Sequence, residues 1–196
     1  MAEQIRDVLL GLPARSAVNI PGLSAEIMER LKPHLQLAET VGLLVSQLAG
    51  GHVQEMELRL QGEFASHPSQ PLVIAALKGL LSAGLGDSIN FVNASLEAKA
   101  RGIQVLEVKD ESSRDFAGGS LQITTRGDQG SRSVTGAVFA DGDLRITSID
   151  AFPVNVTPSS HMLFTRHRDM PGIIGQLGSM LGEHNVNIAA MQVGRK

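Results

Sequence analysis

The segment Asp169-Met170-Pro171-Gly172 combines residue types that can bind a small charged molecule at the start of a helix. Proline suits the first helical turn, where no amide donor is needed, and glycine permits close approach of the backbone. The free amides of that turn can face a carboxylate, while Asp169 could accept a hydrogen bond from an ammonium group. Asn187 follows fifteen residues after Gly172. In the alternative interpretation, Asp169 only caps the helix and Asn187 only begins a strand.

The elements around this motif predict a βαβ unit. A strand is expected at HMLFTRH (161–167) and another at VNIAAMQVG (186–194), with a helix between them. The helix has an apolar face at Ile173, Ile174, Leu177, Met180 and Leu181. Gly172, Gly175 and Gly178 recur every three residues, which suggests close helix packing. Because two strands alone make a marginal sheet, we expect the chain to end in the middle of a domain.

The chain before this unit starts with helical patterns. A helix is expected from Ser24, with an interruption near Pro33 because proline lacks an amide donor and clashes with the preceding turn. A clear amphipathic stretch then continues to Gly50. Residues 72–84 and 88–101 also have helical character.

Strands dominate the rest of this region. VQEMELRLQGEF (53–64) alternates apolar and polar residues, and from residue 103 onward four short strands are separated by GDQGS and DGD turns. The pattern predicts an α+β fold with helices packed on a mainly antiparallel sheet over residues 20–157. Pro158-Ser159-Ser160 is the expected linker to the βαβ unit.

Composition excludes several classes of function. The net charge is −3, from 17 basic and 20 acidic residues that are interspersed along the chain, so we expect no nucleic-acid partner. The chain has no cysteine, which excludes disulfides, thiolate nucleophiles and cysteine-bound metals. No segment approaches the roughly 20 apolar residues that span a bilayer, so we expect no membrane partner and a cytoplasmic location.

Signals for catalysis and for metal binding are equally absent. No G-x-G-x-x-G occurs, and no credible proton-transfer pair is visible, so we expect no bound cofactor and no catalytic residue on this chain. The six histidines are scattered. His161 and His167 could share a strand face but lack a third ligand, and no metal site is predicted.

Three stretches resemble parts of known proteins. RHRDMPGIIGQLGSMLGEHNVNIAAMQVG resembles the first half of an ACT domain, a βαββαβ module that binds amino acids at subunit interfaces. LVIAALKGLL, FVNASLEAKARGI, SLQITTRGDQG and FADGDLRITSIDAFPVNV are similar to the intervening domain of long-form D-3-phosphoglycerate dehydrogenases. EQIRDVLLG with LPARSAVN resembles the segment that returns to the substrate domain of that enzyme. The three stretches occur in the right order and cover nearly the whole chain.

The resemblance implies a domain division and a function. Residues 1–19 would be the tail of a substrate or catalytic domain, residues 20–157 an intervening domain, and residues 158–196 a partial ACT domain. The chain would be a regulatory fragment of an NAD-dependent enzyme that converts 3-phospho-D-glycerate to 3-phosphohydroxypyruvate in serine biosynthesis. It would bind L-serine or a similar amino acid and form a homo-oligomer through both domains, with NAD bound elsewhere in the parent enzyme.

The resemblance also implies two sets of site residues. Residues His167, Asp169, Gly172, Asn187 and Ile188 would line the serine pocket. A second, anionic ligand of the intervening domain would be held by some of Lys109, Arg126, Arg132 and Arg166. The alternative for each of these four cations is a solvated position on the surface.

Two other functions fit parts of the sequence. One is a subunit related to serine dehydratases, which share an intervening fold but use cysteine-bound iron–sulfur clusters that this chain cannot supply. The other is a free-standing ACT-type regulator, which would require a complete module.

Overall fold

The computed structural model describes residues 25–111, 119–139, 142–168 and 170–194. Residues 1–19, the expected tail of a substrate or catalytic domain, lie outside these residues, as does Asp169. The helices are α2 (Ala25–Ala49), α3 (Glu63–Ser66), α4 (Ser69–Leu85), the 3-10 helix η1 (Gly86–Ser88), α5 (Ala94–Ala100) and α6 (Ile173–Glu183). The strands are β1 (Val53–Gln61), β2 (Gln104–Asp110), β3 (Ser120–Gly127), β4 (Gly130–Val138), β5 (Leu144–Ile149) and β6 (Phe152–Val156).

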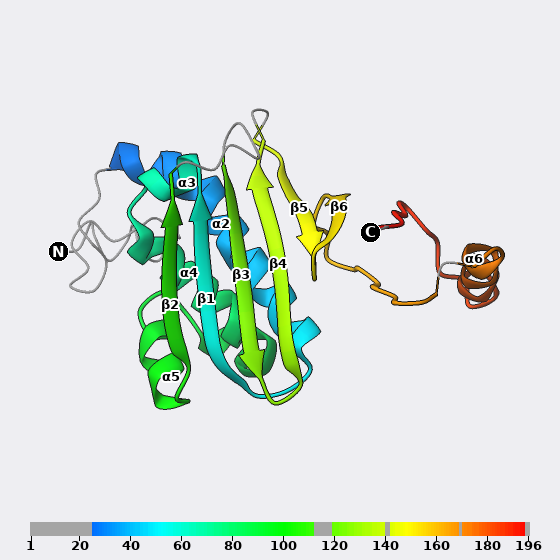
Figure 1. Ribbon diagram of the computed structural model, residues 1–196, viewed down its shortest axis with the longest axis horizontal. Coiled ribbons are helices and arrows are strands. Elements are labelled where there is room, and N and C mark those ends of the chain that lie inside the picture. The colour runs from blue at the N-terminus through cyan, green and yellow to red at the C-terminus, as the bar shows by residue number, and fades with distance from the viewer. Residues whose placement is uncertain (1–24, 112–118, 140–141, 169, 195–196) are drawn as a thin grey trace.

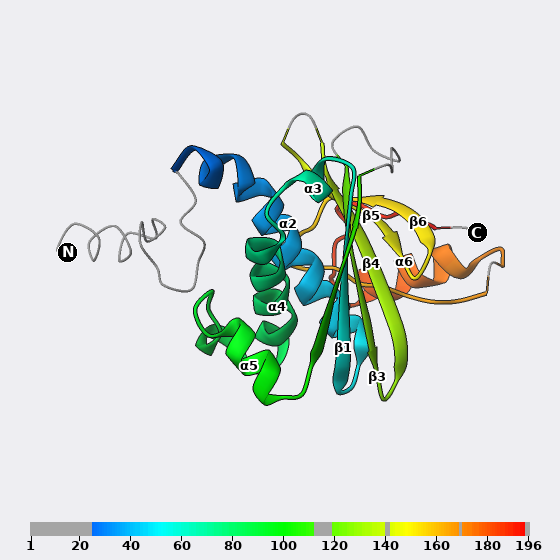
Figure 2. The ribbon, with the colours of Figure 1, turned by 60° about the vertical axis from the view of Figure 1, so that its left-hand side comes forward.

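The strands form a six-stranded sheet in the order β2-β1-β3-β4-β5-β6, and helices α2 and α4 lie against one of its faces (Figures 1 and 2). The α+β prediction is therefore confirmed. The sheet is mainly antiparallel, as predicted: β2 pairs with β1 in parallel, and the other neighbours are antiparallel. The chain between β1 and β2 contains α3, α4 and α5, and a helical crossover of this kind brings two strands into parallel register.

Helix α2 runs without a break through Pro33, where the sequence predicted an interruption. Proline inside a helix costs about 3 kcal/mol or more. The helix packs on α4, β3 and β4, however, and each fully buried Leu or Val contributes about 1.5–3 kcal/mol. The buried side chains of α2 are Leu31, Leu37, Ala38, Val41, Leu44 and Val45. Burial of this stripe outweighs the local penalty of the proline.

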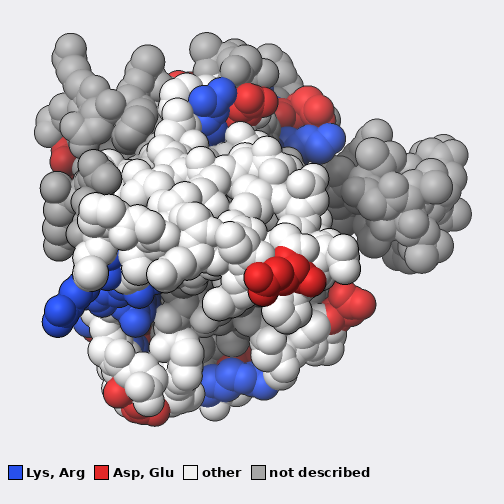
Figure 3. Space-filling model, turned by 90° about the vertical axis from the view of Figure 1, so that its right-hand side faces the viewer, with Lys and Arg blue, Asp and Glu red and all other residues white. Residues whose placement is uncertain are grey.

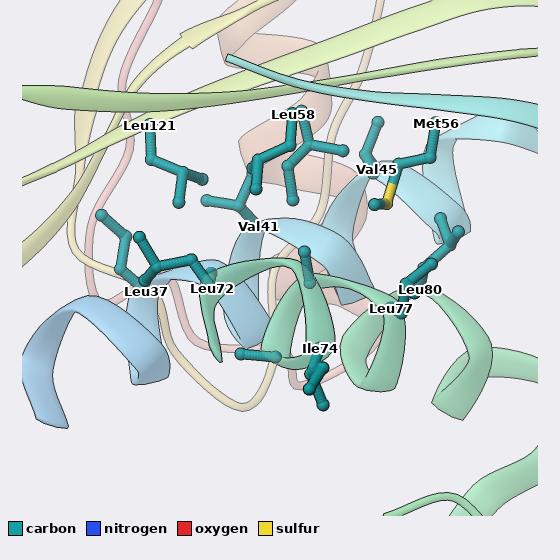
Figure 4. Packing of buried hydrophobic residues seen from close by; sticks show 14 of the residues in the cluster. Leu37, Val41, Val45, Met56, Leu58, Leu72, Ile74, Leu77, Leu80 and Leu121 are labelled. Atoms are coloured by element: carbon teal, nitrogen blue, oxygen red, sulfur yellow. The ribbon is translucent and has the colours of Figure 1, made fainter. Parts of the chain in front are cut away.

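The core lies between the two long helices and the sheet. Leu37 and Val41 of α2 point toward Leu121 and Leu58 of the sheet in Figure 4, and all four side chains are fully buried. The strands alternate accordingly: apolar residues of β1 such as Leu58 face the helices, and the intervening polar residues face away.

The C-terminal part contains the expected helix, α6, but its flanking segments do not pair as strands among the residues that the structure describes. An extended segment forms a ladder only beside a second strand with free backbone groups. The end of the described chain lies beside β6 instead, where the amide of Asn155 donates to Oε1 of Gln192 at 2.8 Å (Figure 1).

The α6 glycines also differ from the expectation of close packing. A Cβ atom placed on Gly175 or Gly178 would meet nothing within 4 Å. The glycine face of α6 is open in this structure.

Candidate functional site

Gly172 begins α6 in a left-handed conformation with φ of 92°, which glycine adopts without strain. Its carbonyl accepts from the amide of Gln176 at 2.9 Å, and no side chain caps the helix start among the described residues. The amide of Ile173 donates to the carbonyl of Met170 at 3.5 Å, and the next amides of the first turn have no acceptor within the helix. Pro171 precedes this turn, although the sequence predicted it inside the first turn.

The other described candidates for the effector pocket are exposed side chains. His167 is exposed, and its Nδ1 lies 2.9 Å from the carbonyl of Arg168. Asn187 and Ile188 lie beyond the C-terminal end of α6, after a turn in which Asn185 adopts a positive φ of 57°. No hydrogen bond joins these residues to one another or to Gly172 within the described part of the chain. The structure thus leaves the candidate pocket residues apart, at the two ends of one helix.

An apolar surface surrounds them. We call it the C-terminal apolar surface, and its exposed side chains are Leu163, Phe164, Met170, Ile174, Met180, Val186, Ile188, Met191 and Val193. Figure 3 views the molecule from the side of β6 and α6, where uncharged atoms make up most of the visible face and charged groups lie toward its margin. Exposed apolar groups gathered in this way mark an interaction surface.

The four candidate cations for an anion do not converge. Lys109, near the end of β2, donates from Nζ to the carbonyl of His67 at 3.1 Å. Arg166 is exposed in the segment before α6 and has no ion pair among the described residues. Arg126 and Arg132 are held by carboxylates in two different places.

Arg126 lies on the sheet face away from the helices. Its guanidinium forms ion pairs with Glu55 and, at 3.2 Å, with Glu57, and Arg59 approaches Glu57 at 2.9 Å. Burial raises the pKa of Glu57, but the hydrogen bonds and charges of Arg59 and Arg126 together lower it by more. The pKa of Glu57 is therefore below its usual value. Arg126 thus already has two anionic partners.

Arg132 joins three elements. Its Nε donates to the carbonyl of Leu48 near the end of α2 at 3.2 Å, and its Nη1 approaches Oδ2 of Asp150 at 2.9 Å. The other carboxylate oxygen of Asp150 accepts from the amide of Ser133 at 3.0 Å. These bonds fix the turn between β5 and β6, where Asp150 has a positive φ of 50°.

The sequence did not predict the contact between two histidines, His34 and His67. The ring of His34 stands edge-on to Phe64, with centroids 4.5 Å apart, and to His67, with centroids 4.9 Å apart. Thirty-three positions separate the two histidines, and no local spacing signals that the fold brings them together.

Neither a metal cluster nor a membrane-spanning element occurs in the part of the chain that the structure describes. No three His, Asp or Glu side chains there are grouped closely enough to hold a metal ion. None of the described helices is long and apolar enough to cross a bilayer.

Comparison with known protein families shows to which family this chain belongs. Residues 30–150 match the D-3-phosphoglycerate dehydrogenase intervening domain. The chain belongs to this family. Residues 161–196 match the ACT domain, so the ACT-domain match follows the intervening-domain match after residues 151–160.

Individual relatives carry the same two regions. The chain is 61% identical to a D-3-phosphoglycerate dehydrogenase of Synechocystis sp., over all of this chain and 35% of the relative. It is 39% identical to the enzyme of that name from Methanocaldococcus jannaschii and 33% identical to that of Bacillus subtilis, in each case over all of this chain and 37% of the relative. The chain therefore spans about a third of the length of these relatives.

The family match covers the described intervening domain, including the histidine pair and the ion pairs of Arg126 and Arg132. The ACT match covers the start of α6 and the C-terminal apolar surface. The effector candidates thus lie in the region that matches the ACT domain, and the four candidate cations are divided between the two regions.

Proposed function

We propose that this chain is the regulatory part of a D-3-phosphoglycerate dehydrogenase and carries half of an amino-acid effector site. Residues 20–157 act as the intervening domain, residues 158–196 contribute to an ACT domain, and residues 1–19 lead back to the catalytic domain. NAD and the oxidation of 3-phospho-D-glycerate belong to the parts of the parent enzyme outside this chain, in the cytoplasm. The observation that carries this proposal is the order of the two family matches, the intervening domain followed along the chain by the ACT domain.

The chemistry at α6 supports an amino-acid ligand. The free amides at the Gly172 end can receive the carboxylate of an amino acid, because a helix N-terminus carries a partial positive charge. Asn187 and His167 add neutral polar groups, and Asp169 adds a carboxylate for the ammonium group. L-serine, with one charged group of each sign and a hydroxyl, matches this set.

The separation of these residues supports a site shared between subunits. Gly172 and Asn187 lie at opposite ends of a helix about 16 Å long, which is too far apart for both to contact one serine directly. A second copy of the chain, seated on the C-terminal apolar surface, would bring its own residues against each end. The open glycine face of α6 allows close approach of such a partner.

The proposal is tested in a longer protein that contains this segment together with the catalytic portion its relatives possess. Asn187→Ala should weaken inhibition by L-serine about ten- to a hundredfold, because a hydrogen bond to a charged ligand contributes about 1.5–3 kcal/mol. The catalytic rate without serine should change little.

Gln176→Ala is the matched control, because Gln176 is an exposed amide of α6 outside the expected pocket. It should leave the serine dose response as it was. An unchanged response in Asn187→Ala would remove this residue from the effector site, and a protein insensitive to serine and to other amino acids before any substitution would contradict the proposed function itself.

A further inference from the structure

The chain leaves the sheet after β6 and then returns to the same strand. Strand β6 ends at Val156, the following segment carries α6, and the described chain comes back to the edge of β6 at Gln192 and Gly194 (Figure 1). Residues 157–191 therefore form a loop whose two ends meet at one strand, and we call it the α6 loop. This loop carries most of the C-terminal apolar surface.

Two contacts among the described residues close this loop. The backbone amide of Asn155 donates to Oε1 of Gln192 at 2.8 Å. Gly194 lies so near β6 that a Cβ atom on it would be 3.1 Å from the backbone oxygen of Pro153 and 3.4 Å from Cγ1 of Val154. Because glycine has no Cβ atom, it permits this close approach to the strand.

The sheet holds Asn155 in place from the side of β5. Oδ1 of Asn155 accepts from Nη1 of Arg145 at 3.4 Å, and Nη2 of Arg145 approaches Oδ2 of Asp143 at 3.3 Å. The guanidinium of Arg145 also stands 4.9 Å from the centre of the ring of Phe139, just after β4. A group that binds Asn155 is thereby joined to the turn between β4 and β5.

The closure of the loop is weak enough to be reversible. Pro153 has no amide, so an outer strand cannot form a complete ladder along β6. No backbone–backbone hydrogen bond joins residues 186–194 to β6 in the part of the chain that the structure describes. No residue of α6 is buried, so packing against the core does not fix this helix. The position of the α6 loop therefore depends on a few contacts at its end.

We propose that Gln192 and Gly194 form a detachable latch, which fastens the α6 loop to the outer edge of β6. When the latch is closed, α6 and the C-terminal apolar surface keep a fixed position beside the sheet. When the latch opens, the α6 loop moves independently of the sheet, and the outer amide of Asn155 is exposed to water. The latch rests on contacts of this chain and does not depend on the function proposed above.

The closed latch also covers part of the edge of β6. Strand edges with free backbone groups pair with other chains, and proteins prevent this by covering or interrupting them. Gln192 and Gly194 cover the outer side of β6, and Pro153 interrupts the same edge. One contact region thus positions the α6 loop and protects the edge of the sheet.

The test measures amide hydrogen exchange at Asn155 by NMR in the whole chain, together with nitrogen relaxation of the α6 amides. An uncovered edge amide exchanges as in an open chain, so protection at Asn155 reports the closed latch. Gln192→Ala removes the acceptor and should speed this exchange about two- to tenfold, the factor that one neutral hydrogen bond contributes to an equilibrium. The heteronuclear NOE of α6 should fall at the same time, while that of β3 stays unchanged.

A second variant and a control complete the test. Gly194→Val places a branched side chain against the backbone of β6 and should open the latch without altering Gln192. The matched control is Gln176→Ala, at an exposed glutamine of α6, which should leave both measurements as they are in the unaltered chain. Open-chain exchange of Asn155 in the unaltered chain, equal rates in Gln192→Ala and the control, or the same α6 motion in all four proteins would overturn the proposal.

Discussion

The close crossing of α2 and α4 depends on two glycines, Gly42 and Gly79. Adding a methyl group at Gly79 tests how closely the two helices pack. A Cβ atom on Gly79 would lie 1.9 Å from the backbone oxygen of Glu39 and 2.9 Å from the amide of Leu43. The contact is reciprocal, because a Cβ on Gly42 would lie 2.2 Å from the backbone oxygen of Ala76. Both obstacles are backbone atoms, which cannot rotate away as a side chain can.

The cost can be worked from these distances. Alanine is intrinsically better than glycine in a helix by about 1 kcal/mol, which favours Gly79→Ala. Ordinary contact requires 3.4–4 Å, so the two helices must separate by more than an ångström along their length. Overpacking of a core costs about 1–3 kcal/mol and occasionally more. Because rigid backbone must move, we expect a clash at the upper end of this scale, about 3–5 kcal/mol, and after the gain from alanine a net loss of about 2–4 kcal/mol in the free energy of unfolding.

Gly84→Ala is the control, because Gly84 lies in the same helix and a Cβ there meets nothing within 4 Å. It should be neutral or stabilising by up to about 1 kcal/mol. Thermal unfolding followed by circular dichroism should show Gly79→Ala lower in Tm by about 5–15 °C. Equal melting of the two variants would refute the close crossing of α2 and α4.

Two further results are expected. Because burial lowers the pKa values of His34 and His67 in the folded chain, the unfolded chain takes up protons near pH 6.5 before the folded chain does. The free energy of unfolding should therefore be constant above about pH 7 and fall as the pH drops below 6.5. Urea unfolding at several pH values checks the sign, and His34→Gln should reduce the dependence of the free energy of unfolding on pH. Arg132→Gln should lower the free energy of unfolding by about 1–2 kcal/mol, since the ion pair with Asp150 is partly screened by solvent. Asp150→Asn should lower it by less, because asparagine tolerates a positive φ and keeps a hydrogen-bond acceptor. Similar losses for the two variants would contradict the role of Arg132 in fixing the turn between β5 and β6.

Local patterns predicted most of the elements. The alternation in β1 and the helical stripe after Pro33 identified the right faces, because burial on one side imposes a fixed period. One error came from outside the local window: the helix through Pro33 is continuous because distant packing offsets a local penalty. The local pattern also does not specify the partner of β2, which pairs in parallel with β1 because of the path of the helical crossover.

The candidate sites were harder to predict for the same reason. The Gly172 start of α6 follows from adjacent residues, and the sequence located it. The ion pairs of Arg126 and Arg132 depend on strand register, which places Glu55 opposite Arg126 across β1 and β3. The contact of His34 with His67 depends on how α2 packs against the turn after α3, so the composition of the chain could not predict it.

The position of α6 links effector binding to association under the proposed function. Helices shorter than about 12–15 residues are marginal in water by themselves, and α6 has 11 residues, none of which is buried. A partner that covers the C-terminal apolar surface therefore stabilises the same helix whose first turn offers amides to the effector. A ligand held at that turn stabilises the helix as well, so each event favours the other by the same free energy. Under the proposed function, effector sensing and subunit association would therefore both depend on the covering of this one helix.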